Sequence, residues 1–218
     1  MPVIECNAGL SFELVAGRTA LLAIDLQRDF LDPDGFVSAS GGDPSAMRAI
    51  VPNAAALIAA ARASGVTVIH TREGYAPDLG DMHALKRERR IAGRDGPLGR
   101  FLIRGEPGHA HVAECLPLPG EPIIDKPGFG SFYRTELETL LRERGIERLI
   151  LFGVTTQCCV SSTLREAVDR GFRCLTVEDA CAATTPALHA AAIDVIYGEG
   201  NLFGWVSDTV RVLQALKA

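Results

Sequence analysis

Six short stretches of the chain are predominantly apolar, and glycine, proline or charged residues bound each of them. Continuous apolar runs of about four to eight residues are typical of strands that are buried on both faces of a sheet. The pattern therefore predicts strands at 19–25, 66–71, 122–126, 148–154, 172–179 and 203–206.

The segments between these strands have the features of helices. Predicted helices cover residues 43–64, 135–145, 161–170, 185–197 and the C-terminal residues. Gly65 stands where the first of them should stop, and Thr135 with Glu138 forms a capping box for the second. Residues 72–121 are irregular, with one short helix around 82–92, and so long a connection in a compact domain indicates a functional loop.

Strands that alternate with helices predict an α/β fold, in which a parallel sheet is covered by helices on both faces as a three-layer sandwich. We find no repeat, linker or low-complexity segment, so residues 1–218 are predicted to form one domain. Ligands of such sheets bind at the carboxyl ends of the strands.

Composition narrows the classes of partner. The chain is 47% hydrophobic, its net charge is −5 and its pI is about 5.6, so it lacks the basic field that nucleic-acid binding requires. No apolar run is long enough to span a membrane, and Glu5 and Glu13 interrupt an N-terminal segment that does not read as a secretory signal. Six cysteines lack the density of a disulfide scaffold and the spacing of a metal site. We expect a cytoplasmic protein with reduced thiols, bound to neither membrane nor nucleic acid.

The stretch LILFGVTTQCCVSST (149–163) carries the strongest chemical signal. An apolar strand enters a Gly/Thr turn, and Cys159 follows where a helix should begin. A helix N-terminus lowers the pKa of a thiol and offers N–H groups to an oxyanion, so this turn could supply both a nucleophile and an oxyanion hole. The alternative is that Cys158 and Cys159 are small buried hydrophobes, as many free cysteines are.

Two further reactive residues stand at predicted strand ends. Asp25 stands at the end of the first strand, and Lys126 stands at the end of the third. Each has a structural alternative, because Asp25 could cap a helix and Lys126 could be a solvated loop residue. None of the five histidines ends a strand with suitable neighbours, so a carboxylate beside a lysine is the predicted base and charge partner for the thiol.

AIDLQRDF, DKPGFGSF and GVTTQCCVSSTLREA, in this order, resemble the isochorismatase-like cysteine hydrolases from about residue 18 to the C-terminus. The resemblance implies a six-stranded, mostly parallel sheet, an Asp25–Lys126–Cys159 triad and a homotetramer. It also implies a cis peptide between Val154 and Thr155 and an oxyanion hole formed by the N–H groups of Thr155 and Cys159. Metal-binding relatives carry histidines after the first strand, and residues 31–47 contain none, so we expect neither a metal nor another cofactor.

Within that family, the chain looks most like the biuret- and triuret-cleaving members. The motifs that carry this resemblance are HTREGYAPDL, RGEPG, IIDKPGFGSF and the TLREA…RGF run. Phe129 stands where these members have a basic residue, and Glu199 stands where they have a substrate-binding glutamine. Both changes favour a positively charged ligand, and a carboxylate pairs well with a planar guanidinium. Guanylurea is therefore the preferred small-molecule substrate. Phe30, Arg72 and Glu73 are predicted to line its pocket.

Other functions remain open at this point. Biuret, triuret, nicotinamide or an N-carbamoyl amino acid are alternative substrates of an amidohydrolase. A flavodoxin-like binding protein is the non-enzymatic alternative, in which Cys159 would be no more reactive than the other cysteines. Isochorismatase chemistry is disfavoured because it does not need the cysteine. A nucleotide-dependent enzyme is disfavoured because no phosphate-binding glycine loop follows the first strand.

Overall fold

The computed structural model describes residues 2–90 and 92–218, and its centre is a six-stranded parallel sheet. The strands lie in the order β10-β9-β8-β3-β4-β7, and each neighbouring pair is parallel. Their bounds are β3 Thr19–Ile24, β4 Thr67–Glu73, β7 Ile123–Lys126, β8 Arg148–Val154, β9 Arg173–Ala182 and β10 Trp205–Ser207. This confirms the predicted fold class and all six predicted strands.

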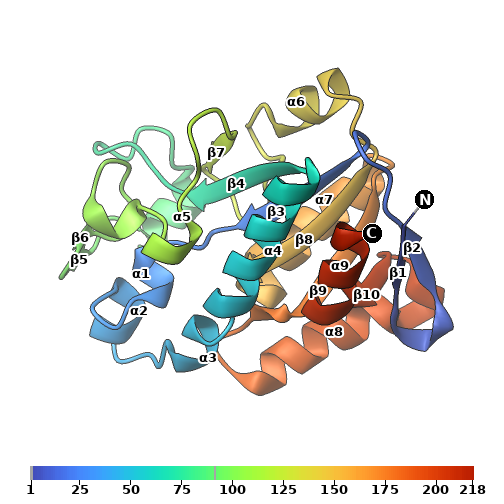
Figure 1. The fold of residues 1–218 in the computed structure, drawn as a ribbon. Coiled ribbons are helices and arrows are strands. Elements are labelled where there is room, and N and C mark those ends of the chain that lie inside the picture. Colours follow the sequence, from blue (N-terminus) through green and yellow to red (C-terminus); the bar gives the residue numbers. More distant parts are fainter. Residues whose placement is uncertain (1, 91) are drawn as a thin grey trace.

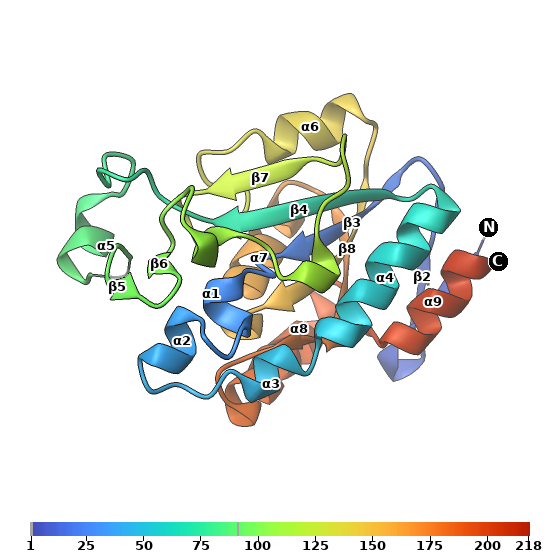
Figure 2. The same ribbon diagram turned by 60° about the vertical axis from the view of Figure 1, so that its left-hand side comes forward.

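Helices cover both faces of this sheet (Figures 1 and 2). Their bounds are α1 Arg28–Leu31, α2 Phe36–Ala39, α3 Ser45–Arg48, α4 Val51–Ser64, α5 Ala84–Glu88, α6 Leu137–Glu143, α7 Ser161–Asp169, α8 Pro186–Asn201 and α9 Thr209–Lys217. Helices α4 and α9 pack side by side on one face, and α7 lies on the other. No helix among these described residues is long and apolar enough to cross a membrane.

The direction in which successive strands are added to the sheet reverses beside β3. From β3 the chain proceeds through β4 to β7 on one side, and β8, β9 and β10 extend the sheet on the other. Strands β3 and β8 are buried at every position, which explains their continuous apolar sequences. A crevice at the carboxyl ends of the strands is the usual ligand site of such a sheet, and four strand ends converge here.

The helix predicted over 43–64 is two helices in the structure. Helix α3 ends at Arg48, and α4 begins at Val51 with Pro52 in its first turn. Proline lacks a backbone N–H and fits the start of a helix better than its interior, so Pro52 marks a new beginning. Gly65 has φ of 73° and ends α4 as predicted.

The long connection from β4 to β7 is folded rather than irregular. It contains α5 and the short strands β5 (Asp95–Gly96) and β6 (Gly99–Arg100), so the helix predicted around 82–92 is shorter, and residue 91 lies outside the described residues. The connection forms a second small core together with Phe36 of α2, to which it contributes Tyr75, Met82, Ala92, Phe101, Leu102 and Ile103. An N-terminal hairpin of β1 (Val3–Glu5) and β2 (Ser11–Glu13) was not predicted, because three-residue strands carry little periodicity.

Candidate active site

The turn after β8 is held tightly against β3. Gly153 has φ of 128°, and a Cβ on this residue would clash with the carbonyl oxygen of Ile24. Only glycine fits such a close backbone approach. The peptide between Val154 and Thr155 is cis, as the resemblance implied.

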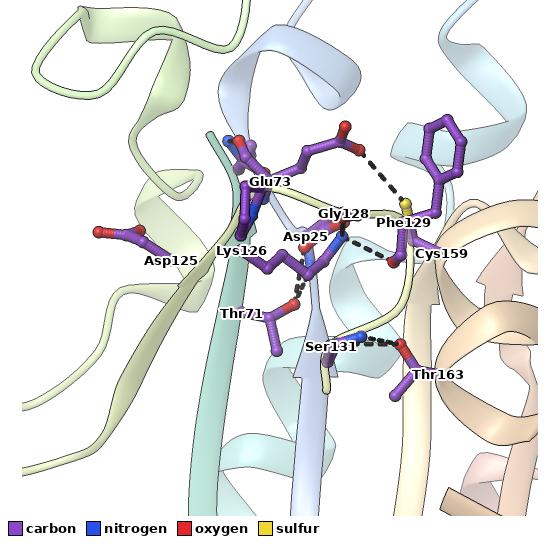
Figure 3. Close-up of polar contacts among 12 residues, drawn as sticks. Asp25, Thr71, Glu73, Asp125, Lys126, Gly128, Phe129, Ser131, Cys159 and Thr163 are labelled. Atoms are coloured by element: carbon purple, nitrogen blue, oxygen red, sulfur yellow. Dashed lines mark hydrogen bonds and ion pairs between the residues drawn. The ribbon is translucent and has the colours of Figure 1, made fainter. Parts of the chain in front are cut away.

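Cys159 lies in a π-helical turn over Thr156–Val160, directly before α7. The Cys159 side chain is buried, and its Sγ donates a hydrogen bond to Oε2 of Glu73 at 3.7 Å (Figure 3). Cys158 is only partly buried. All six cysteines are free thiols, so Cys159 is available as a nucleophile.

Asp25 and Lys126 form a fully buried ion pair beside this thiol (Figure 3). Lys126 Nζ lies 2.7 Å from Oδ2 of Asp25 and donates to the carbonyl oxygens of Gly128 (3.0 Å) and Phe129 (2.9 Å). Thr71 donates to the other carboxylate oxygen of Asp25 at 2.6 Å. Both charged groups are thus held in one orientation, next to the sulfur.

Burial and mutual attraction set the proton affinities of this group. Burial raises the pKa of Asp25, although the ammonium of Lys126 opposes the shift. Burial alone would lower the pKa of Lys126, but Asp25, Cys159 and Glu73 together raise it. Asp25 is therefore a better proton acceptor than an ordinary aspartate, and Lys126 stays charged.

The thiol of Cys159 is not ionised in advance. Its contact with Cys158, its burial and the carboxylates of Asp25 and Glu73 raise its pKa well above the ordinary value, and Lys126 opposes them. The sequence predicted a lowered pKa from the helix N-terminus. The contact with Cys158 and the burial of the thiol, together with the two carboxylates, produce the opposite shift. The thiol consequently needs a base at the moment of attack. Asp25 and Glu73 each have a carboxylate oxygen within 4.8 Å of the sulfur, and the thiol donates its hydrogen bond to Glu73.

Glu73 and Lys86 form a second buried ion pair on the other side of the thiol. Lys86 Nζ lies 2.9 Å from Oε1 of Glu73, and Tyr75 donates to the same oxygen at 2.7 Å. Glu73, which was predicted to line the pocket, is the last residue of β4. Lys86 is in α5 and was not predicted, because nothing in the local sequence distinguishes it from a solvated helix lysine.

A model of the isochorismatase domain matches residues 19–210. The chain belongs to the isochorismatase family. It is 34% identical over 215 residues, covering 93% of this chain and 84% of the relative, to the ureidoacrylate amidohydrolase RutB of two strains of Methylorubrum extorquens. With the geometry above, these matches make it a hydrolase of carbon–nitrogen bonds in linear amides.

Solved structures of the family have the same fold. A cysteine hydrolase from Pseudomonas syringae pv. phaseolicola superposes with a TM-score of 0.82 at 24% identity, covering 100% of this chain and 98% of that one. N-carbamoylsarcosine amidase from Thermoplasma acidophilum superposes with a TM-score of 0.70 at 26% identity, covering 88% and 96%.

Of the residues predicted to bind substrate in this isochorismatase-family hydrolase, Phe129 and Glu73 lie at the cluster. The ring of Phe129 is 38% exposed, and Lys86 Nζ stands 3.8 Å from its centroid. Phe129 and Lys86 also line a cavity of about 270 Å³. Phe30, in α1, is half-buried against both cores and meets Phe101 edge to face.

Arg72 and Glu199 do not reach the cluster. Arg72 precedes Glu73 in β4, so it points to the opposite face, where it makes two hydrogen bonds to Asp125 at 2.7 and 2.9 Å. Asp125 faces away from Cys159 (Figure 3). Glu199 is exposed beyond the break in α8.

The direction of α8 explains the position of Glu199. The helix starts after the carboxyl end of β9 and leads back to β10, whose first residue, Trp205, pairs with Leu175 near the amino end of β9. Glu199 therefore belongs to the edge of the sheet opposite the triad. The predicted contact between Glu199 and the substrate is corrected on this ground.

Among the described residues, Asp25, Glu73 and Cys159 come nearest to a metal-ligand set, with one donor atom each within 4.8 Å of the others. Each carboxylate is already neutralised by a lysine at hydrogen-bond distance. A metal cation would have to displace these ammonium groups, so the residues fit a metal poorly.

Proposed function

We propose that this hydrolase cleaves the carbamoyl C–N bond of a small ureide and releases ammonia, with guanylurea as the first candidate substrate. The names of two relatives support the general class, since ureidoacrylate and N-carbamoylsarcosine both carry a carbamoyl group on nitrogen. The buried Glu73 carboxylate beside the nucleophile supports the choice within that class.

The chemistry begins with a proton transfer. Asp25 removes the thiol proton of Cys159, and the sulfur attacks the carbamoyl carbon as the C=O bond opens to an oxyanion. Lys126 offsets the negative charge that this step creates, and the N–H groups of Thr155 and Cys159 are the proposed donors to the oxyanion.

The second half of the cycle returns the enzyme to its starting state. Asp25 gives its proton to the departing nitrogen, the C–N bond breaks, and ammonia leaves behind an acyl thioester on Cys159. A water molecule, deprotonated by Asp25, then attacks the thioester carbon. The C–S bond breaks, the product leaves with a carboxyl group on its nitrogen, and Asp25 returns its proton to the sulfur.

Glu73 favours a substrate with N–H donors and without negative charge next to the carbamoyl group. Its Oε1 is occupied by Lys86 and Tyr75, whereas Oε2 accepts only from the thiol of Cys159 among the described contacts. A guanidinium N–H can replace the thiol as the donor to Oε2, and a hydrogen bond between two charged groups is stronger than one to a neutral amide. Biuret offers neutral N–H donors and is the second candidate. A substrate carboxylate at this point would be repelled.

Glu73→Gln tests the proposal. Ammonia release from guanylurea, biuret and N-carbamoyl amino acids gives kcat/KM for each substrate. A charged hydrogen bond is worth about 1.5–3 kcal/mol, so the guanylurea-to-biuret ratio should fall by roughly ten- to a hundredfold in the variant. Glu199→Gln is the matched comparison, because Glu199 is exposed at the opposite edge of the sheet, and it should leave the ratio unchanged.

Two results would contradict the proposal. Wild-type enzyme could turn over biuret faster than guanylurea, or the ratio could stay constant in Glu73→Gln. A ratio that changed with Glu199 and not with Glu73 would instead restore the interpretation made from the sequence.

A further inference from the structure

The use of lysine in this chain is unusual. Only three of its 22 lysine and arginine residues are lysines. Lys217 is exposed near the end of α9, whereas Lys86 and Lys126 are buried to 3% and 0% exposure. Both buried lysines pair with a carboxylate beside the same thiol. Charged groups are rarely buried unless they are paired, and burying a pair is costly. The Lys86–Glu73 pair is therefore a candidate for a functional role, as the Lys126–Asp25 pair is.

Every proton of the Lys86 ammonium has an acceptor. Nζ donates to Oε1 of Glu73 at 2.9 Å, to the hydroxyl of Tyr75, and to the carbonyl oxygen of Pro127 at 3.4 Å. The ring of Phe129 covers the group on a further side. No proton is left for a substrate, so Lys86 acts on the chemistry only through the residues it holds.

The main residue it holds is Glu73. Lys86 and Tyr75 both bind Oε1, which leaves Oε2 directed at the sulfur of Cys159. The two ion pairs also balance the charge of the cluster, with two carboxylates and two ammonium groups around a neutral thiol. Without Lys86, a second carboxylate would stand uncompensated beside Asp25.

We propose that Lys86 is a positioning residue that balances the charge of Glu73 and aims its Oε2 at the reaction centre, so that helix α5 controls the substrate preference of the enzyme. This inference rests on the proposed function where it concerns the substrate. Its effect on the thiol is independent of any substrate.

The thiol supplies a direct readout. At the alkaline pH where Cys159 titrates, Lys86→Met leaves the carboxylate of Glu73 unpaired next to the sulfur, and Glu73→Gln leaves the ammonium of Lys86 unpaired. The first change should move the midpoint of the alkylation rate against pH upward, and the second should move it downward. The double variant should return it close to the parent value. The groups facing this thiol are Asp25, Lys126, Glu73 and Cys158, with Lys86 behind Glu73.

The experiment measures alkylation of Cys159 by iodoacetamide in a Cys158→Ala background, so that one thiol of the turn reports. Lys217→Met is the matched control, because it removes an exposed lysine by the same substitution, and it should leave the midpoint unchanged. Lys86→Arg retains the charge and should keep the midpoint nearer to the parent than Lys86→Met does. If Lys86→Met does not fold, the double variant should fold, because it buries no unpaired charge.

Substrate kinetics provide the second readout. In Lys86→Met the guanylurea-to-biuret ratio of kcat/KM should fall about tenfold or more, and in a Glu73→Gln background the same substitution should change the ratio little. Opposite shifts of the two midpoints without guanylurea turnover would support the role of Lys86 and refute the proposed substrate. Unchanged midpoints in both single variants, or a Lys86→Met effect that persists in full without Glu73, would overturn the inference.

Discussion

Asp25→Asn should destabilise the protein as well as abolish its activity. The substitution keeps the size of the side chain but removes the negative charge that lies 2.7 Å from Lys126 Nζ. Both partners are fully buried, and the remaining acceptors of the ammonium are the carbonyl oxygens of Gly128 and Phe129. The variant therefore leaves a buried cation without its counter-charge.

The size of the loss follows from this burial. Breaking a buried pair by removing one partner costs about 3–5 kcal/mol, out of a total stability of about 5–15 kcal/mol for a typical protein. For a chain of this length that loss lowers Tm by roughly 6–20 °C. A partly exposed pair is worth about 0–1 kcal/mol. Asp125 lies in β7 and pairs with Arg72, and its side chain is 33% exposed. Asp125→Asn is therefore the matched control.

Urea denaturation and thermal melting of both variants measure the difference. Asp25→Asn should be less stable by several kcal/mol, with Asp125→Asn close to the parent. Asp25→Asn/Lys126→Met should regain stability, because no unpaired charge stays buried, and should remain inactive. Wild-type stability in Asp25→Asn would refute the assignment of a buried ion pair, and substantial turnover would refute Asp25 as the proton carrier.

Two further predictions concern the thiols and the histidines. Cys159→Ala should reduce turnover by several orders of magnitude, whereas Cys158→Ala should retain most activity, as steady-state ammonia release will show; comparable losses in both would refute the assignment of the nucleophile. Burial lowers the pKa of His109 to about 4 and of His111 to about 3. The unfolded chain binds these protons below about pH 6.5, so their contribution to stability is complete above that pH and is lost as the pH falls towards 4. At pH 5 each histidine should lower the free energy of unfolding, measured in urea, by about 2 kcal/mol. Between pH 7 and pH 5, His111→Gln should lose less of this free energy than the exposed control His83→Gln. Equal stability of the parent protein at the two pH values would contradict this reasoning.

The sheet and the positions of Asp25, Lys126 and Cys159 could be predicted because both depend on local sequence patterns. A strand that is buried on both faces must be largely apolar, as β3 and β8 are after their first residues, and the alternation with helices makes such strands parallel. Parallel strands bring their carboxyl ends to one edge. Lys126 ends a strand, and Asp25 and Cys159 each follow one within a few residues, so their meeting required no knowledge of the loops.

The proton affinity of Cys159 and the break before Pro52 were harder to predict for different reasons. The helix N-terminus and the contact with Cys158 are local features, but the burial of the thiol depends on the fold. The carboxylates that also raise its pKa, Asp25 and Glu73, lie more than 80 residues away along the chain. The break between α3 and α4 is local, but the alanine-rich sequence is compatible with one continuous helix. Only the structure shows that Pro52 lies in the first turn of a new helix.

The substrate-facing side of the site depends on contacts that no local pattern contains. Position 199 appeared to offer the acidic group that a cationic substrate needs, but the path of α8 carries Glu199 to the far edge of the sheet. Glu73 fills the position instead, and its orientation depends on Lys86 from a helix within the long connection. The charged side chains around the thiol come from separate elements and meet only through tertiary packing. Short motifs therefore indicate the reaction class, whereas they do not indicate the substrate preference.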